Sequence, residues 1–207
     1  MHKYINTKND IEKLILNTMK YLFLIFNTVN YIFPILEIFP NTNIFKFLAM
    51  MCSILWIGYD YLFCKYLWKK NRYLSLKLHT PNLNGIWKME GFSYNIEKDK
   101  DFLFEGEIEI IQEFNRISIN LKTKNSSSKS ITAVLSEIPN GDYDLIYTYL
   151  NSPKDTKKEN RDMKMHYGCC KITFDKNLKT AECKYFNDGR ERTSYGIMKL
   201  TKKEEVV

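Results

Sequence analysis

Two long apolar segments near the start of the chain limit its possible folds more than any other feature. They read YLFLIFNTVNYIFPILEIF, at 21–39, and IFKFLAMMCSILWIGYDYLFC, at 44–64. Each is close to the length of about 20 helical residues that crosses the hydrocarbon core of a bilayer. A short connection of turn-forming residues, PNTN at 40–43, separates them. The pattern predicts an N-terminal transmembrane α-helical hairpin.

Cationic side chains flank this hairpin on its two outer sides. They are Lys3, Lys8, Lys13 and Lys20 before the first segment, and Lys65, Lys69, Lys70 and Arg72 after the second. The positive-inside rule then places both termini in the cytoplasm. A cleavable signal peptide is the alternative for the first segment, but the polar leader is long and no small-x-small cleavage site follows. We expect a two-helix transmembrane anchor and oligomerisation region at 1–72, and a cytoplasmic domain at 73–207.

Polar side chains recur inside the two segments at helical spacing. They are Asn27, Asn30, Glu37, Ser53 and Asp60. A carboxylate that faced lipid at the centre of a helix would cost about 2.5–3.5 kcal/mol on insertion scales. We therefore expect this polar stripe to face protein or water. It can pack between the two helices of one chain, lie near the membrane interface, or face other copies of the chain around a polar lumen.

From residue 84 onward, strand signals replace helix signals. Apolar and polar residues alternate, with Ile117, Ile119 and Leu121 on one face and Ile131, Ala133 and Leu135 on another. The predicted strands are 85–95, 104–114, 116–124, 130–138, 143–151, 163–174, 180–187 and 192–202. Asn-Gly and Asp-Gly pairs mark tight turns between some of them. We predict an all-β domain, an eight-stranded antiparallel up-and-down barrel that can hold one small ligand. A β-sandwich is the alternative.

Several function classes fit the sequence poorly. The net charge of +7 is spread without a long basic run, which disfavours binding to DNA or RNA polymers. The cysteines have neither disulfide-framework nor zinc-site spacing. The three histidines are far apart, and no HxxxH, CxxC or phosphate-loop pattern occurs. We therefore expect no catalytic residues, no metal and no cofactor.

A binding function fits better. One strand end carries hydroxyl groups, an amide and a cation, donors that suit phosphate oxygens. These residues are Thr123, Asn125, Ser126, Ser128, Lys129 and Ser130. Tyr147 and Tyr149 share a strand face with Asn151, and tyrosine rings can stack on nucleobases. The alternatives are a solvated hairpin turn for the serines and ordinary strand positions for the tyrosines.

A series of motifs resembles a known family. They are LNGIWK at 83–88, IEIIQEFNRISINLKTKNSSSKSITAVL at 108–135, LIYTYLNSP at 145–153, MHYGCCKI at 165–172, CKYFND at 183–188 and RTSYGIMKL at 192–200. Their order and spacing resemble the CD-NTase-associated protein 15 family of bacterial CBASS anti-phage effectors. Members of that family join two N-terminal membrane helices to a barrel that receives a cyclic oligonucleotide. The family usually has Arg where this chain has Lys129, which lacks the bidentate fork of Arg.

The resemblance implies a function. A partner CD-NTase makes a cyclic dinucleotide during infection, the barrel binds it, and the effector oligomerises in the bacterial inner membrane and disrupts it, causing abortive infection. It implies that Ser126, Ser128, Lys129 and Ser130 contact phosphate or ribose, and that Tyr147, Tyr149 and Tyr195 contact the bases. Further candidates are Asn151, His166 and Thr193. The alternatives are a membrane-anchored, lipocalin-like barrel for a lipid or other apolar ligand, a tethered interaction scaffold, and an enzyme that turns the nucleotide over.

Overall fold

The computed structural model describes residues 1–6, 58, 61–70, 80–96, 99–154, 165–188 and 194–203. The chain divides into two compact units. One contains Met1–Lys8 together with Pro81–Val207, and the other contains Asn9–Thr80. In the second unit the described residues include a π-helix at Phe63–Leu67 and α3 at Trp68–Lys70.

The predicted membrane hairpin is not tested by the described residues. The segment 21–39 and most of 44–64 lie outside them, as do Asn27, Asn30, Glu37, Ser53 and Asp60. Within the part of the chain that is described, no helix has the length and apolar character needed to span a bilayer.

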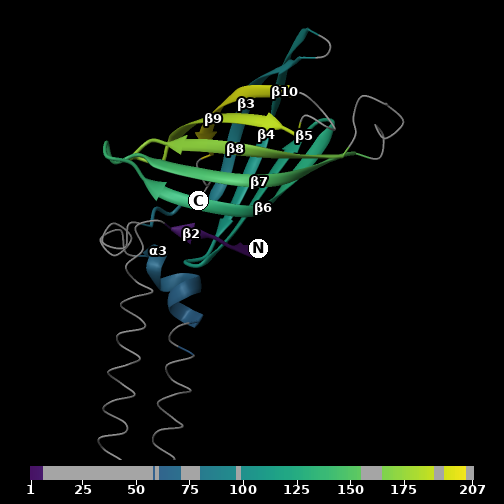
Figure 1. Ribbon diagram of the computed structural model, residues 1–207. Helices are drawn as coiled ribbons and strands as arrows, with labels where there is room; N and C mark the ends of the chain where they lie inside the picture. Colours follow the sequence, from purple (N-terminus) through teal and green to yellow (C-terminus); the bar gives the residue numbers. More distant parts are fainter. Residues whose placement is uncertain are drawn as a thin grey trace, which may run out of the picture. The chain divides into compact units, whose positions relative to one another are not determined.

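The first unit is a closed barrel. Its eight strands are β3 (Gly85–Asn95), β4 (Lys100–Gln112), β5 (Arg116–Thr123), β6 (Ser126–Glu137), β7 (Tyr143–Pro153), β8 (His166–Phe174), β9 (Thr180–Asn187) and β10 (Ser194–Lys202). Each strand pairs antiparallel with the next, and β10 pairs with β3 to close the ring (Figure 1). This confirms the predicted up-and-down barrel and excludes the β-sandwich.

Two short strands add to the same sheet. They are β1 (His2–Lys3) and β2 (Ile5–Asn6), from the first residues of the chain. β1 pairs antiparallel with β5, and β2 pairs parallel with β6 (Figure 1). This addition was not predicted, because six residues are too few to show a periodic pattern.

Large apolar side chains fill one end of the barrel. Trp87 and Phe174 meet edge to face, with ring centroids 4.9 Å apart. The Trp87 indole N–H donates to the Leu83 carbonyl at 3.2 Å, which satisfies its buried polar atom. The other buried side chains there include Ile108, Ile110, Leu135, Leu145, Ile172 and Leu200. This packed floor closes one end of the barrel. We call the opposite end, where β3, β5, β7 and β9 finish, the mouth.

The start of β6 differs from the prediction in two ways. The turn before it contains only Lys124 and Asn125. The three serines therefore lie in the strand and not in the turn between the predicted strands 116–124 and 130–138. The pairing of β6 with β7 also shifts between Ser130 and Thr132. Ile131 is the extra residue of this bulge and is 45% exposed. The prediction that Ile131 shares a face with Ala133 and Leu135 was therefore wrong, because a bulge reverses the alternation of side chains.

Candidate ligand site

The inward side chains of the strands change character along the barrel. Near the floor they are large and apolar, in the middle they are tyrosine, glycine, cysteine or methionine, and at the mouth they are polar. On β7 the inward series runs Leu145, Tyr147, Tyr149 and Asn151. On β3 it runs Trp87, Met89, Gly91, Ser93 and Asn95. The barrel therefore has a dry floor beneath a hydrogen-bonding mouth.

A cavity of about 370 Å³ lies inside this mouth. That volume is within the usual range for small-molecule sites, about 300–1,000 Å³. Its polar lining comes from six strands and one turn, and consists of Ser93, Asn95, Thr123, Asn125, Ser126, Ser128, Asn151, His166 and Asn187. Its aromatic lining consists of Phe102, Phe104, Tyr147, Tyr149 and Tyr185.

Three predicted residues meet on one rung of the sheet. Ser128 pairs with Asn151 across β6 and β7, and Asn151 pairs with His166 across β7 and β8. All three side chains are buried, between 4% and 7% exposed. The structure thus brings a hydroxyl, an amide and an imidazole together at the mouth, three groups that the sequence analysis proposed as separate ligand contacts.

The next rung holds a hydrogen-bonded chain. The Tyr149 hydroxyl donates to Asn187 Oδ1 at 2.7 Å, and Asn187 Nδ2 donates to Ser194 Oγ at 2.5 Å. Tyr149 crosses Gly168 of β8 to reach Asn187, and a Cβ at Gly168 would lie 2.4 Å from the tyrosine ring. Only glycine leaves the room that this crossing needs.

A second tyrosine lies over a second glycine. A Cβ at Gly196 of β10 would lie 2.7 Å from the ring of Tyr185 on β9. The rings of Tyr185 and Phe104 meet edge to face, with centroids 6.1 Å apart, and the ring centroids of Tyr147 and Tyr149 lie 6.0 Å apart. The cavity wall below the mouth is therefore built from aromatic rings held at fixed angles.

Burial fixes the protonation of these phenols. Loss of solvent raises the pKa of Tyr147 well above 10.0 and also raises the pKa of Tyr149, and nearby thiols add to both effects. Desolvation likewise raises the pKa of the Cys183 thiol. At neutral pH both tyrosines keep their protons and can donate hydrogen bonds inside the cavity.

No Lys, Arg, Asp or Glu among the described residues lines this inner cavity. Lys129 lies on the outer face of β6, between the inward Ser128 and Ser130. Its side chain therefore points away from the cavity, and the phosphate contact that the resemblance implied stays a prediction. The alternation of a strand explains this, since a residue between two inward serines must face outward.

Two other predicted residues also lie away from the cavity. Tyr195 is 49% exposed on the outer face, where its ring lies 5.4 Å from that of Tyr94. Ser130 is buried, but its hydroxyl accepts the Ile119 backbone N–H at 2.9 Å and does not line the cavity. Thr193 lies outside the described residues.

The turn between β5 and β6 is held by side chains. Thr123 Oγ1 accepts the backbone N–H groups of Asn125 and Ser126 at 3.3 and 3.1 Å, which lets the chain reverse over two residues. The ammonium group of Lys154 donates a hydrogen bond to the Thr123 carbonyl at 2.6 Å. Lys154 therefore places a positive charge at the rim of the mouth.

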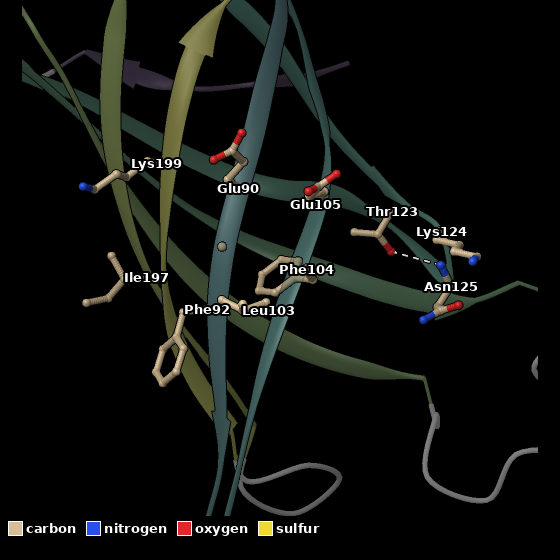
Figure 2. Close-up of a pocket in the computed structure, with 11 residues that line it drawn as sticks. Glu90, Phe92, Leu103, Phe104, Glu105, Thr123, Lys124, Asn125, Ile197 and Lys199 are labelled. Atoms are coloured by element: carbon tan, nitrogen blue, oxygen red, sulfur yellow. Dashed lines mark hydrogen bonds between the residues drawn. The ribbon is translucent and has the colours of Figure 1, made fainter.

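A second hollow, of about 680 Å³, lies mainly on the outer face of β3, β4 and β10. Figure 2 shows Glu90 and Glu105 on neighbouring strands, with Lys199 on one flank and Lys124 on the other. Its apolar part includes Leu103, which is 88% exposed. Its two carboxylates offset its two ammonium groups for an anion, whereas the inner cavity offers buried hydrogen-bond donors, so we assign the ligand site to the inner cavity.

Several residues at the cavity were not among the predicted ligand contacts. Ser93, Asn95, Asn187, Tyr185 and Phe104 face the cavity, and Ser194 bonds to Asn187. Extending the alternation of each strand from its buried floor residue would have found them. From Trp87, for example, every second residue of β3 leads to Ser93 and Asn95.

Comparison with known proteins agrees with this geometry. Residues 78–202 match the family described as Cap15, cyclic dinucleotide receptor domain. A curated relative, CD-NTase-associated protein 15 of Yersinia aleksiciae, is 38% identical over 142 residues. That alignment covers 69% of this chain and 64% of the relative, so the matched part spans just under two thirds of the relative's length. The family match begins before β3 and ends with β10, so it contains the whole barrel. On this match, and as the sequence motifs predicted, the chain belongs to the Cap15 cyclic dinucleotide receptor domain family.

Proposed function

We propose that the inner cavity binds a cyclic dinucleotide. The observation that carries this proposal is the graded interior, with polar groups at the mouth, aromatic rings below them and a packed floor. A cyclic dinucleotide has the matching parts, because its phosphodiesters and riboses are polar and its bases are flat and aromatic. A lipocalin-like lipid carrier would need a continuous apolar interior, which the described wall does not have.

Neutral donors hold the phosphates in this proposal. Hydroxyl and amide groups form charge-assisted hydrogen bonds with phosphate oxygens, which are stronger than bonds between neutral groups. Ser126, Ser128 and Asn151 are the inward donors of β6 and β7 nearest the mouth. Asn125 and His166 border them and serve as further donors, while the Thr123 hydroxyl donates to the Ser126 carbonyl and holds the turn.

Aromatic side chains hold the bases. Tyr147, Tyr149, Tyr185 and Phe104 line the middle of the cavity. Stacking of a base on an aromatic ring contributes about 1–3 kcal/mol per base. Asn187 and Asn95 place amide groups beside the rings, where they can read base edges.

The barrel acts as a receptor, not as an enzyme, in a CBASS anti-phage system. A functionally linked CD-NTase supplies the ligand, and residues 21–39 and 44–64 anchor the chain in the bacterial inner membrane with both termini in the cytoplasm. Ligand binding favours barrel arrangements that bring several copies together, so membrane assemblies become more populated. Those assemblies disrupt the inner membrane and cause abortive infection.

Isothermal titration of the full chain in detergent micelles tests the binding step. A panel of cyclic dinucleotides is compared with the linear dinucleotide and the mononucleotide of the same bases. We expect saturable heat from at least one cyclic ligand and weaker binding of its linear form. Heat from none of the cyclic ligands would overturn the proposal. Chromatography of the same samples should show unchanged ligand, whereas turnover would indicate an enzyme.

A liposome assay tests the membrane step separately. The full chain is reconstituted into liposomes that hold a self-quenched dye, and the ligand that binds best is added. We expect dye release that depends on the ligand and rises steeply with protein density, because several copies must meet. Ligand binding without dye release, at any density, would restrict the function to reception.

A further inference from the structure

The first six residues form an extended strand between β5 and β6. His2 and Lys3 pair with Ile117 and Arg116, and Ile5 and Asn6 pair with Val134 and Leu135. The exposure of this segment alternates. His2, Tyr4 and Asn6 are the more buried residues, and Met1, Lys3 and Ile5 are exposed. The segment therefore behaves as a barrel strand with an inner and an outer face.

A gap in the barrel wall explains where this segment fits. β5 and β6 pair directly only over residues 120–122 and 127–129, beside their connecting turn. The bulge at Ile131 follows on β6, and beyond it the N-terminal segment pairs with both strands. We call this gap, bordered by 116–119 and 132–135, the seam. An open seam would leave two strand edges without partners, which costs backbone hydrogen bonds.

The inward side chains of the segment bond to residues of the barrel wall. His2 Nε2 lies 2.8 Å from Ser130 Oγ, and the same hydroxyl accepts the Ile119 N–H where β5 and β6 part. Ser130 is two residues from Ser128, on the same inward face of β6, and Ser128 lines the cavity. One side chain thus connects the N-terminal segment to the strand that carries candidate ligand donors.

Tyr4 makes a second connection. Its hydroxyl donates to the Phe114 carbonyl at 2.9 Å and accepts from Gln112 Nε2 at 3.1 Å. Gln112 Oε1 also accepts the Leu83 N–H at 2.9 Å, and Gln112 is 1% exposed. Residues 9–80 leave the barrel unit after Lys8 and rejoin it at Pro81. One buried amide therefore holds the chain near both of these junctions.

We propose that the seam is a binding groove for the N-terminal strand of the chain, and that docking of this strand raises ligand affinity by fixing Ser130 and, through it, Ser128. The contacts of residues 1–6 with β5 and β6 support the groove, and the effect on ligand affinity rests on the proposed function. Because coupling between two binding events is reciprocal, ligand binding also strengthens docking of the strand. The residues that precede the predicted membrane anchor then respond to the ligand.

Hydrogen exchange of the full chain in detergent micelles tests the seam without any ligand. Deletion of residues 2–6 should speed exchange of the backbone amides at 116–119 and 132–135, and a synthetic peptide of residues 1–6 should restore protection. His2→Ala is a milder variant and should show a smaller change of the same sign. Lys3→Ala is the matched control, because Lys3 faces outward, and should exchange like the parent. Equal exchange in the deletion variant and the parent would overturn the groove.

Titration of the same proteins with the best-binding cyclic dinucleotide tests the coupling. The deletion should weaken affinity by about 5-fold or more, the lower end of typical coupling between sites. His2→Gln, which keeps a hydrogen-bonding group, should recover part of the loss seen in His2→Ala. Faster exchange with unchanged affinity would overturn the coupling and leave the groove in place. Failure of the parent itself to bind any ligand would overturn the proposed function and the coupling together, while the exchange result would still decide the groove.

Discussion

Tyr149 and Asn187 lie on strands that do not pair with each other, yet the tyrosine hydroxyl donates to the asparagine Oδ1 at 2.7 Å across the intervening β8. Asn187 in turn donates a hydrogen bond from Nδ2 to Ser194 Oγ of β10. Side chains of β7, β9 and β10 are thus joined across β8, in addition to the backbone ladders that connect these strands. This chain of side chains holds the mouth in one shape before a ligand arrives, and preorganisation of that kind raises affinity.

Gly168→Ala should damage both the cavity and the stability of the barrel. The added methyl group would lie 2.4 Å from Tyr149 and 2.8 Å from the Phe186 carbonyl, so the ring must leave Asn187. Such overpacking typically costs about 1–3 kcal/mol of unfolding free energy. Urea unfolding measures the stability, and titration measures the ligand affinity. Tyr149→Phe separates the two causes, because it removes the hydroxyl and keeps the ring. An alanine variant as stable as the parent would contradict this account of the glycine.

Ser128→Ala should weaken ligand binding without unfolding the protein. If its hydroxyl donates to a phosphate, a hydrogen bond to a charged group worth about 1.5–3 kcal/mol is lost, which is roughly a 10- to 100-fold loss of affinity. Titration of both proteins with the same ligand provides the measurement.

Ser127→Ala is the matched control for that variant. Ser127 is the neighbouring serine on the same strand and is exposed on the outer face. Lys129→Ala is a second control, because its ammonium also lies on the outer face. Both should stay within about 2-fold of the parent, as expected for surface substitutions. A large loss in Lys129→Ala would show that the cation reaches the ligand after all.

Phe174→Ala should reduce stability more than it reduces binding. The ring is fully buried against Trp87 in the floor, and its removal leaves a cavity there. Truncation of a buried phenylalanine typically costs about 3–5 kcal/mol. We expect a large fall in the urea midpoint, and near-normal affinity at temperatures where the variant is folded. Loss of binding by a fully folded variant would mean that the floor takes part in recognition.

The regular part of the barrel was predictable because alternation is a local signal. Ile117 and Ile119 share one face, as the sequence analysis predicted, and that face is buried; Cys170, Ile172 and Phe174 alternate in the same way. The Asn-Gly turn is also present, with Gly141 at a φ of 87° and its N–H bonded to the Ile138 carbonyl at 2.9 Å. In these places neighbouring residues alone decide the structure.

The candidate site was only partly predictable, because it depends on which way each side chain points. Ser128, Tyr147 and Tyr149 line the cavity, whereas Lys129 and Tyr195 share the chemistry of ligand contacts but face outward. A single bulge at Ile131 also reversed the expected alternation. The N-terminal strand escaped prediction for another reason, since its partners are more than 100 residues away in the sequence.

High pH should destabilise the barrel through its buried phenols. Desolvation raises the pKa of Tyr147 and Tyr149 above the value of about 10 that an unfolded chain has. Above pH 10 the unfolded state therefore loses these protons while the folded state keeps them, and stability falls as pH rises. Below pH 10 both states hold the protons and these groups add no pH dependence. Urea unfolding of the full chain between pH 8 and 11 should show the decline, and Tyr147→Phe/Tyr149→Phe should make it less steep above pH 10. The buried Cys183 thiol, whose pKa is also raised, contributes to the decline in both proteins. An identical slope in the double variant would contradict the burial of these hydroxyls.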